Sequence, residues 1–345
     1  TFLESFLYHI VDSTMFIAIC QVLIFSLVMA RAAIYLKKRG MADKEIYLFL
    51  SLNVLWPQTL VNIVTLWKDI WCSVFLLWLV ILLTELVDDI IGFFNRKMQV
   101  LELFISLCGV STFRHNGIMI LVGMILIFII IALKKRFYKI LPICLLLGVF
   151  VLGGKRIIIK NCDIIPNGSV ASVVLFHGLA YEQYLNEPLL FETQQYMDSI
   201  LPSDVVKKEY YSYSANPYMY GEIPTEYNTM NKFRNSDLKE VLQFYIKEFL
   251  KKPFLIIKDR LYGTDLLWNV FRPKDAYNYM YAADVQDNEF GIERIHTPYE
   301  KKMQRILKIT ESYEPLFWRG GVYVDLLVIL VLSEILKKRY RTLVI

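Results

Sequence analysis

The sequence predicts an α-helical polytopic membrane protein with about seven transmembrane helices and a mainly helical extracytoplasmic domain between helices six and seven. The first reason is composition: 56% of the 345 residues are hydrophobic, 21% are charged, and the mean hydropathy is +0.41. Such a chain is too apolar for an ordinary soluble domain and too charged to lie wholly in a bilayer. The second reason is the placement of the basic residues, which follow alternate apolar segments.

Seven apolar segments approach the ~20 residues that one bilayer crossing requires. They cover approximately 14–36, 46–66, 70–90, 98–113, 117–133, 140–154 and 316–336. Pro57 lies inside the second segment, where the missing backbone N–H of proline is expected to kink or break the helix.

Lysine and arginine predict the orientation of these segments. They gather after the first, third, fifth and seventh segments, at Lys37, Lys38, Arg39, Lys44, Arg96, Lys97, Lys134, Lys135, Arg136, Lys139, Lys337, Lys338, Arg339 and Arg341. The intervening short loops hold only Lys68 and Arg114. Because basic loops stay cytoplasmic, the Lys68 loop, the Arg114 loop and the long polar region are all expected on the extracytoplasmic side.

Three parts of the chain follow from this pattern. Residues 1–154 form the multipass transmembrane domain, 155–315 form the extracytoplasmic soluble domain, and 316–345 contain the final transmembrane helix with a basic cytoplasmic tail. Within the soluble domain, Pro188 is expected to open a helix that runs to about residue 200. Asp237 is expected to cap an amphipathic helix that ends near Lys251.

Cysteine usage and the first residue add two expectations. Four of the five cysteines lie in apolar segments, so no disulfide framework or metal-ligand spacing can be built around the remaining Cys162. The chain begins with Thr1, with neither an initiator methionine nor a signal peptide, and we interpret it as a fragment.

Arg114, His115, Asn116 and Gly117 join two apolar segments and form the first candidate site. A guanidinium offers a fork of donors to a phosphate, whereas the imidazole and the amide can orient a hydroxyl. Gly117 permits a close turn of the backbone. The alternative is an interfacial arginine that snorkels toward lipid headgroups.

Trp67, Lys68 and Asp69 form the second candidate site, at the predicted start of the third membrane helix. A cation and a carboxylate stand side by side there. A plain helix cap at Asp69 and an interfacial belt residue at Trp67 would look the same. The predicted position on the same side as Arg114 favours a functional interpretation.

Other polar residues receive structural interpretations. Arg31 and Glu102 lie at membrane depth near the inner ends of their helices, where snorkelling explains both. Glu85 is interpreted as part of an interfacial face at the end of the third segment. His177, in the soluble domain, is a candidate substrate ligand, but a single histidine in a helical domain is more often structural.

The order of these features resembles the GT-C superfamily, and in particular bacterial members similar to glycosyltransferase family 39. The resemblance is carried by the Trp67-Lys68-Asp69 turn after a proline-containing helix and by the turn at 113–117 two helices later. The polar region with His177 near its start also resembles these enzymes. No nucleotide-binding loop, serine hydrolase motif or zinc protease motif is present in the sequence.

The resemblance implies transfer of a sugar from a polyprenyl-phosphate donor to an envelope glycan or lipid acceptor, on the extracytoplasmic face of a bacterial plasma membrane. Lys68 and Arg114 would hold the donor phosphate, and His115, Asn116 and Trp67 would complete the substrate site. The main catalytic carboxylate of the family lies in the first outer loop, which together with the first helix is expected upstream of Thr1.

Asp69 is therefore the candidate catalytic residue within this chain, with a divalent metal such as Mg or Mn as its candidate cofactor. Membrane lipids are expected partners, and nucleic acid is not. Two alternatives stay open: an envelope polysaccharide polymerase or ligase, and a non-enzymatic polymer transport protein. A transport protein predicts a continuous polar path through the helices.

Overall fold

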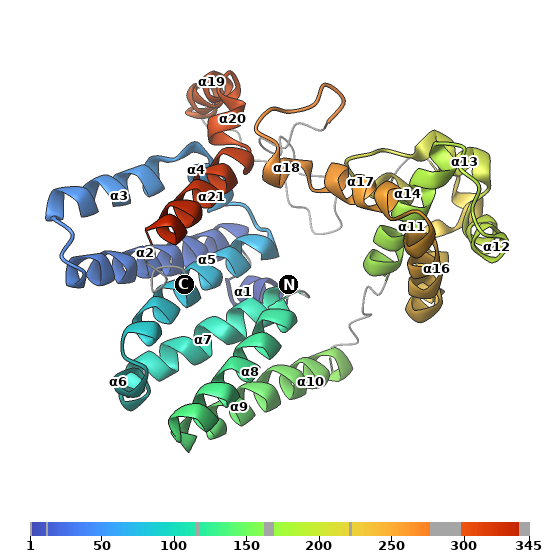
Figure 1. The fold of residues 1–345 in the computed structure, drawn as a ribbon. Helices are drawn as coiled ribbons and strands as arrows, with labels where there is room; N and C mark the ends of the chain where they lie inside the picture. The colour runs from blue at the N-terminus through green and yellow to red at the C-terminus, as the bar shows by residue number, and fades with distance from the viewer. Residues whose placement is uncertain are drawn as a thin grey trace. The chain divides into compact units, whose positions relative to one another are not determined.

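A computed structural model describes residues 2–11, 13–114, 117–161, 169–220, 223–276 and 298–337, and every regular element in these ranges is helical (Figure 1). The chain divides into two compact units. Unit 1 comprises 1–164, 280–312 and 330–345, and unit 2 comprises 165–279 and 313–329. The division passes through helix α21 (Gly321–Leu336). The domain boundaries predicted at 154 and 315 stay a prediction.

Unit 1 contains the apolar helices of the N-terminal half. Its elements are α1 (Phe2–Val11), α2 (Thr14–Lys38), α3 (Asp43–Leu55), α4 (Pro57–Asn62), α5 (Lys68–Asp88), α6 (Ile90–Asn95), α7 (Lys97–Phe113), α8 (Gly117–Lys135), η1 (Tyr138–Ile140), α9 (Leu141–Gly148), the π-helical η2 (Val149–Gly153), α10 (Gly154–Asn161) and α19 (Glu300–Glu311).

Among the residues that the structure describes, three helices are long and apolar enough to cross a membrane, namely α2, α5 and α8. The other predicted spans appear as shorter or interrupted helices in the described ranges. The second is divided at Trp56, since α3 ends at Leu55 and α4 begins at Pro57, which confirms the predicted proline break. The fourth is the 17-residue α7, the sixth combines α9 with η2, and the last is the 16-residue α21. Seven crossings stay a prediction.

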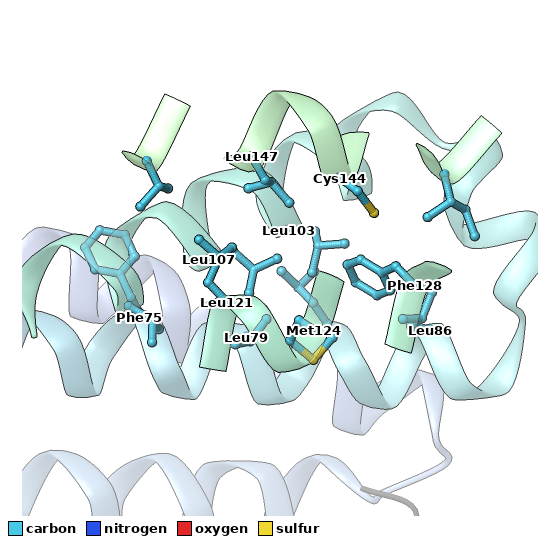
Figure 2. Packing of buried hydrophobic residues seen from close by; sticks show 14 of the residues in the cluster. Phe75, Leu79, Leu86, Leu103, Leu107, Leu121, Met124, Phe128, Cys144 and Leu147 are labelled. Atoms are coloured by element: carbon cyan, nitrogen blue, oxygen red, sulfur yellow. The ribbon is translucent and has the colours of Figure 1, made fainter. Parts of the chain in front are cut away.

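The core of unit 1 lies between α5, α7, α8 and α9. Figure 2 shows side chains of these helices packed together, among them Leu79, Leu107, Leu121 and Leu147. Gly109 of α7 packs directly against α5, since an added Cβ would lie 2.3 Å from the ring of Phe75. Glycine is thus required at this crossing for steric reasons.

Unit 2 is a helical domain organised around α11 (Ser169–Tyr184). Phe176 of this helix is fully buried and packs edge-on against Tyr218 and Phe233. The surrounding elements are α12 (Phe191–Ile200), α13 (Ser203–Glu209), α14 (Pro217–Tyr220), η3 (Thr225–Tyr227), α15 (Thr229–Asn235), α16 (Leu238–Lys251), α17 (Pro253–Gly263), α18 (Asp265–Trp268) and α20 (Glu314–Phe317).

Local sequence signals explain several helix starts in unit 2. The Asp237 carboxylate accepts a hydrogen bond from the backbone N–H of Lys239 at 2.9 Å, so the predicted cap of α16 is confirmed. The helix predicted to open at Pro188 begins instead at Phe191. The backbone N–H of Leu190 donates to the buried Glu248 carboxylate at 2.7 Å, which holds the preceding residues outside the helix.

Cysteines contribute no cross-link in the described ranges. Cys20, Cys72, Cys108 and Cys144 are free thiols, whereas Cys162 lies outside the described residues.

Candidate functional site

The first turn of α5 carries three of the residues singled out from the sequence. Trp67 is the N-cap residue and is exposed, and Lys68 and Asp69 are the first two residues of the helix. A carboxylate in the first turn is stabilised by the partial positive charge of the helix N-terminus. The local sequence therefore explains why a helix begins here.

Asp69 forms an ion pair with Arg114, which is 45 positions away in the sequence and follows the last residue of α7. The Nε of Arg114 lies 2.8 Å from Oδ1 of Asp69, and an Nη donates to Oδ2 at 3.2 Å. The two side chains are 55% and 42% exposed, so the pair contributes only about 0–1 kcal/mol to stability. Its main consequence is geometric, because the guanidinium is held in a fixed orientation.

Aromatic packing one turn deeper holds the two helix ends together. Trp71 is 1% exposed and stacks on Phe113, with ring centroids 5.6 Å apart and an interplanar angle of 7°. Phe113 also stacks on Phe75 at 5.7 Å. These contacts place the start of α5 against the end of α7, so Asp69 and Arg114 meet without help from their own weak ion pair.

Helix α8 starts close to the last turn of α7. The backbone N–H of Gly117 donates to the carbonyl of Arg114 at 3.0 Å, and an added Cβ at Gly117 would lie 1.9 Å from the carbonyl oxygen of Val110. A backbone atom cannot move aside as a flexible side chain can. Gly117 therefore allows α8 to start directly against α7, as expected from the sequence.

The other candidate residues are Lys68, His115 and Asn116. Lys68 is exposed and has no ion-pair partner among the described residues. His115 and Asn116 lie outside the described residues. No group of three or more potential metal ligands occurs in the described part of the chain. The structure thus brings Asp69 and Arg114 into contact, with Lys68 adjacent to Asp69 in the chain.

A second charged cluster lies toward the other ends of the same helices. The Arg31 guanidinium of α2 binds the carboxylates of Glu85 and Glu102, the latter at 2.9 Å, and the Gln99 amide donates to Glu85 at 2.8 Å. The Arg31 side chain is 15% exposed. The snorkelling interpretation of Arg31 and Glu102 is wrong, because the Arg31 guanidinium is bound to the carboxylates of Glu102 and Glu85.

Opposite ends of unit 1 therefore carry different polar groups. Arg39, after α2, pairs with Asp88 at the end of α5 at 2.5 Å, and Phe94 of α6 contacts Phe137, which follows α8. The basic segments that follow α2 and α8 thus lie near the C-terminal end of α5. The Asp69–Arg114 pair lies at its N-terminal end.

His177 lies in a buried polar network of unit 2 and is 3% exposed. Its Nδ1 lies 2.9 Å from Asp259, and its Nε2 lies 2.9 Å from the backbone carbonyl of Tyr211. The Tyr210 hydroxyl donates to the same Asp259 oxygen at 2.8 Å. Burial raises the pKa of Tyr210 far above its ordinary value. Because both ring nitrogens are engaged, the geometry favours a structural role for His177.

Comparison of the chain with protein-family models, with curated proteins and with solved structures finds no match.

Proposed function

We propose that this chain is a GT-C-type membrane glycosyltransferase that transfers a sugar from a polyprenyl-phosphate-linked donor to an envelope glycan or lipid acceptor, on the extracytoplasmic face of a bacterial plasma membrane. The observation that carries the proposal is the contact between Asp69 and Arg114, next to the free cation of Lys68, at the ends of apolar helices. A lipid-linked phosphate would reach such a position from the bilayer, and soluble substrates would reach it from water.

Each residue has a role that suits its position. Lys68 and Arg114 donate hydrogen bonds to the donor phosphate, on which negative charge develops as the bond to the sugar breaks. Asp69 reaches Arg114 with both carboxylate oxygens, so we assign it the role of orienting the guanidinium. Trp67 is exposed beside these groups and contacts the donor, while His115 and Asn116 shape the sugar site.

A polymer transport function is disfavoured by the packing between the two polar ends of unit 1. Leu79, Leu82 and Leu107 are each at most 1% exposed and fill the space between α5 and α7. An aqueous path for a hydrophilic polymer along this interface would need polar walls. The apolar core therefore favours a reaction at one end of the helices over transport of a polymer between them.

A transfer assay tests the proposal. Membranes containing the protein are supplied with a set of polyprenyl-phosphate sugars that carry a radiolabelled sugar, and the labelled product is measured. We expect Arg114→Ala and Lys68→Ala each to lower transfer by about 10²–10³-fold, because each removes a donor to the developing phosphate charge. Lys44→Ala is the matched control, since Lys44 is an exposed lysine in the first turn of a helix, α3, as Lys68 is in α5.

Two results would contradict the proposal. Equal amounts of labelled product from both variants and from the unaltered protein would show that Lys68 and Arg114 do not bind the donor phosphate. Elongation of a polymer, in place of single-sugar transfer, would identify an envelope polymerase or ligase.

A further inference from the structure

Unit 2 has an open cleft of about 830 Å³ that none of the roles above uses. It lies between α12, α15 and α16, and its lining residues are mostly polar. The volume falls within the ~300–1,000 Å³ that is usual for pockets that hold small organic ligands. A ligand as large as a disaccharide or trisaccharide would occupy it.

Amide side chains dominate one wall of the cleft. Asn231 and Asn235 are four residues apart on α15 and therefore lie on the same helix face, and Asn228 immediately precedes that helix. Gln195 of α12 faces the same cleft. Each amide offers two donors and an acceptor, which matches the combined donor and acceptor character of a sugar hydroxyl.

Two aromatic rings also line the cleft. Tyr196 of α12 stacks on Phe244 of α16, with centroids 5.1 Å apart. The ammonium of Lys247 lies 5.8 Å from the centroid of the Phe244 ring, so the contact with the C–H groups of a sugar is assigned to the Tyr196 ring. The buried Tyr196 hydroxyl has no hydrogen-bond partner of good geometry among the described residues. Burial raises the pKa of Tyr196 to about 12, so at neutral pH the hydroxyl is protonated and can donate.

The charges of the cleft select against phosphates and other anions. Its acidic residues are Glu192, Asp237 and Glu240, and its single lysine, Lys232, donates to the backbone carbonyl of Ile200 at 3.0 Å. A nucleotide or a phosphorylated ligand would meet three carboxylates and one lysine, whose ammonium already donates to a backbone carbonyl. An extended peptide is also disfavoured, because the described part of the chain has no strand edge to which it could add.

We infer that the cleft between α12, α15 and α16 is a binding site for a neutral oligosaccharide of two to three sugars. The amides of Asn231 and Asn235 bind hydroxyl groups, and Tyr196 supplies a donor beside the aromatic surface. This inference goes beyond the proposed transfer reaction, because it concerns binding at residues that are distinct from Lys68, Asp69 and Arg114.

Saturation-transfer NMR measures this binding without turnover, so its failure is distinguishable from failure of the proposed reaction. The full chain is placed in lipid nanodiscs, since maltoside detergents carry a disaccharide headgroup that would compete. The probes are di- and trisaccharides of glucose, galactose, mannose and N-acetylglucosamine at millimolar concentration. We expect at least one probe to receive saturation from the protein and to give a dissociation constant by titration.

Matched variants locate the binding. The Asn231→Ala/Asn235→Ala double variant should raise the dissociation constant about tenfold, through loss of hydrogen bonds to the ligand. Tyr196→Phe should raise it several-fold and leave the fold intact, because its hydroxyl has no well-formed bond within the described protein. Gln243→Ala, an exposed amide on α16 outside the cleft, should leave binding unchanged.

Three outcomes would overturn the inference. They are the absence of saturation transfer to every oligosaccharide, equal dissociation constants for the unaltered protein and for both cleft variants, and binding of a peptide pool by a protein that binds no sugar.

Discussion

Replacement of Arg31 by Met is expected to lower the apparent melting temperature of the full chain by on the order of 10 °C. The change leaves Glu85 and Glu102 facing each other among apolar helices, with side-chain exposures of only 10% and 21%. Removal of one partner from a buried ionic cluster typically costs about 3–5 kcal/mol. At about 2–4 °C per kcal/mol for a chain of this size, the shift is readily measured by intrinsic tryptophan fluorescence.

Two control variants separate lost charge pairing from lost packing. In the triple variant Arg31→Met/Glu85→Gln/Glu102→Gln, no uncompensated charge is left, so most of the stability should return. Arg31→Lys keeps the charge, but an ammonium lacks the planar fork that bridges two carboxylates. The fall in its melting temperature should therefore lie between those of the other two variants. A melting temperature unchanged in Arg31→Met would show that the cluster does not hold α2, α5 and α7 together.

Replacement of Asp259 by Ala is expected to destabilise unit 2 by about 3–5 kcal/mol. Asp259 is fully buried and accepts from Tyr210 and His177, and it also pairs with Arg260. Its removal leaves the Tyr210 hydroxyl and the Nδ1 of His177 without this acceptor in the interior of the domain, and it breaks the pair with the partly exposed Arg260. Hydrogen exchange measured by mass spectrometry should rise in α11, α13 and α17.

The matched changes for this experiment are Asp259→Asn and Asp198→Ala. Asp259→Asn keeps the size of the side chain and one acceptor oxygen. Hydrogen exchange in unit 2 should therefore rise less than in Asp259→Ala. Asp198→Ala removes an exposed carboxylate on α12 that accepts only from Gln194, one turn away, and it should leave exchange unchanged. Equal exchange rates in Asp259→Ala and the unaltered protein would contradict the structural role of the network.

Local signals predicted several helix boundaries, because these depend on a few neighbouring residues. Pro57 lacks the N–H that a continuous helix needs, and the structure divides the helix there. Asp237 caps α16 through a hydrogen bond within its own turn. In the predicted final span, α21 begins only at Gly321, and the preceding Arg319 is buried and bound to Asp265.

Contacts between distant segments were predicted less well. The expectation that Asp69 and Arg114 share one side was derived from loop charges, but their pairing depends on Trp71 and Phe113, whose stacking no local pattern reveals. The Arg31 cluster was missed for a related reason. In a helix that is apolar all round, the sequence does not indicate which face points inward, so a charged residue cannot be assigned a partner.

The oligosaccharide cleft was also missed, although one signal was present. Asn231 and Asn235 repeat at helical spacing beside Asn228, and such a row of amides on one exposed face is a feature that sequence inspection can detect. The aromatic surface of the cleft could not be predicted, because Tyr196 and Phe244 are 48 residues apart in the sequence and meet only through the packing of α12 against α16.

The central claim is that Lys68 and Arg114 share the extracytoplasmic side of a membrane, whereas the basic segment after α8 lies on the other side. Single cysteines at Lys68, Arg114 and Lys134, in a variant that lacks all five native cysteines, test it directly with a membrane-impermeant maleimide on intact bacterial cells. We predict labelling at Lys68→Cys and Arg114→Cys without permeabilisation, and at Lys134→Cys only after it. Labelling of Lys68→Cys and Arg114→Cys from opposite sides would contradict the account.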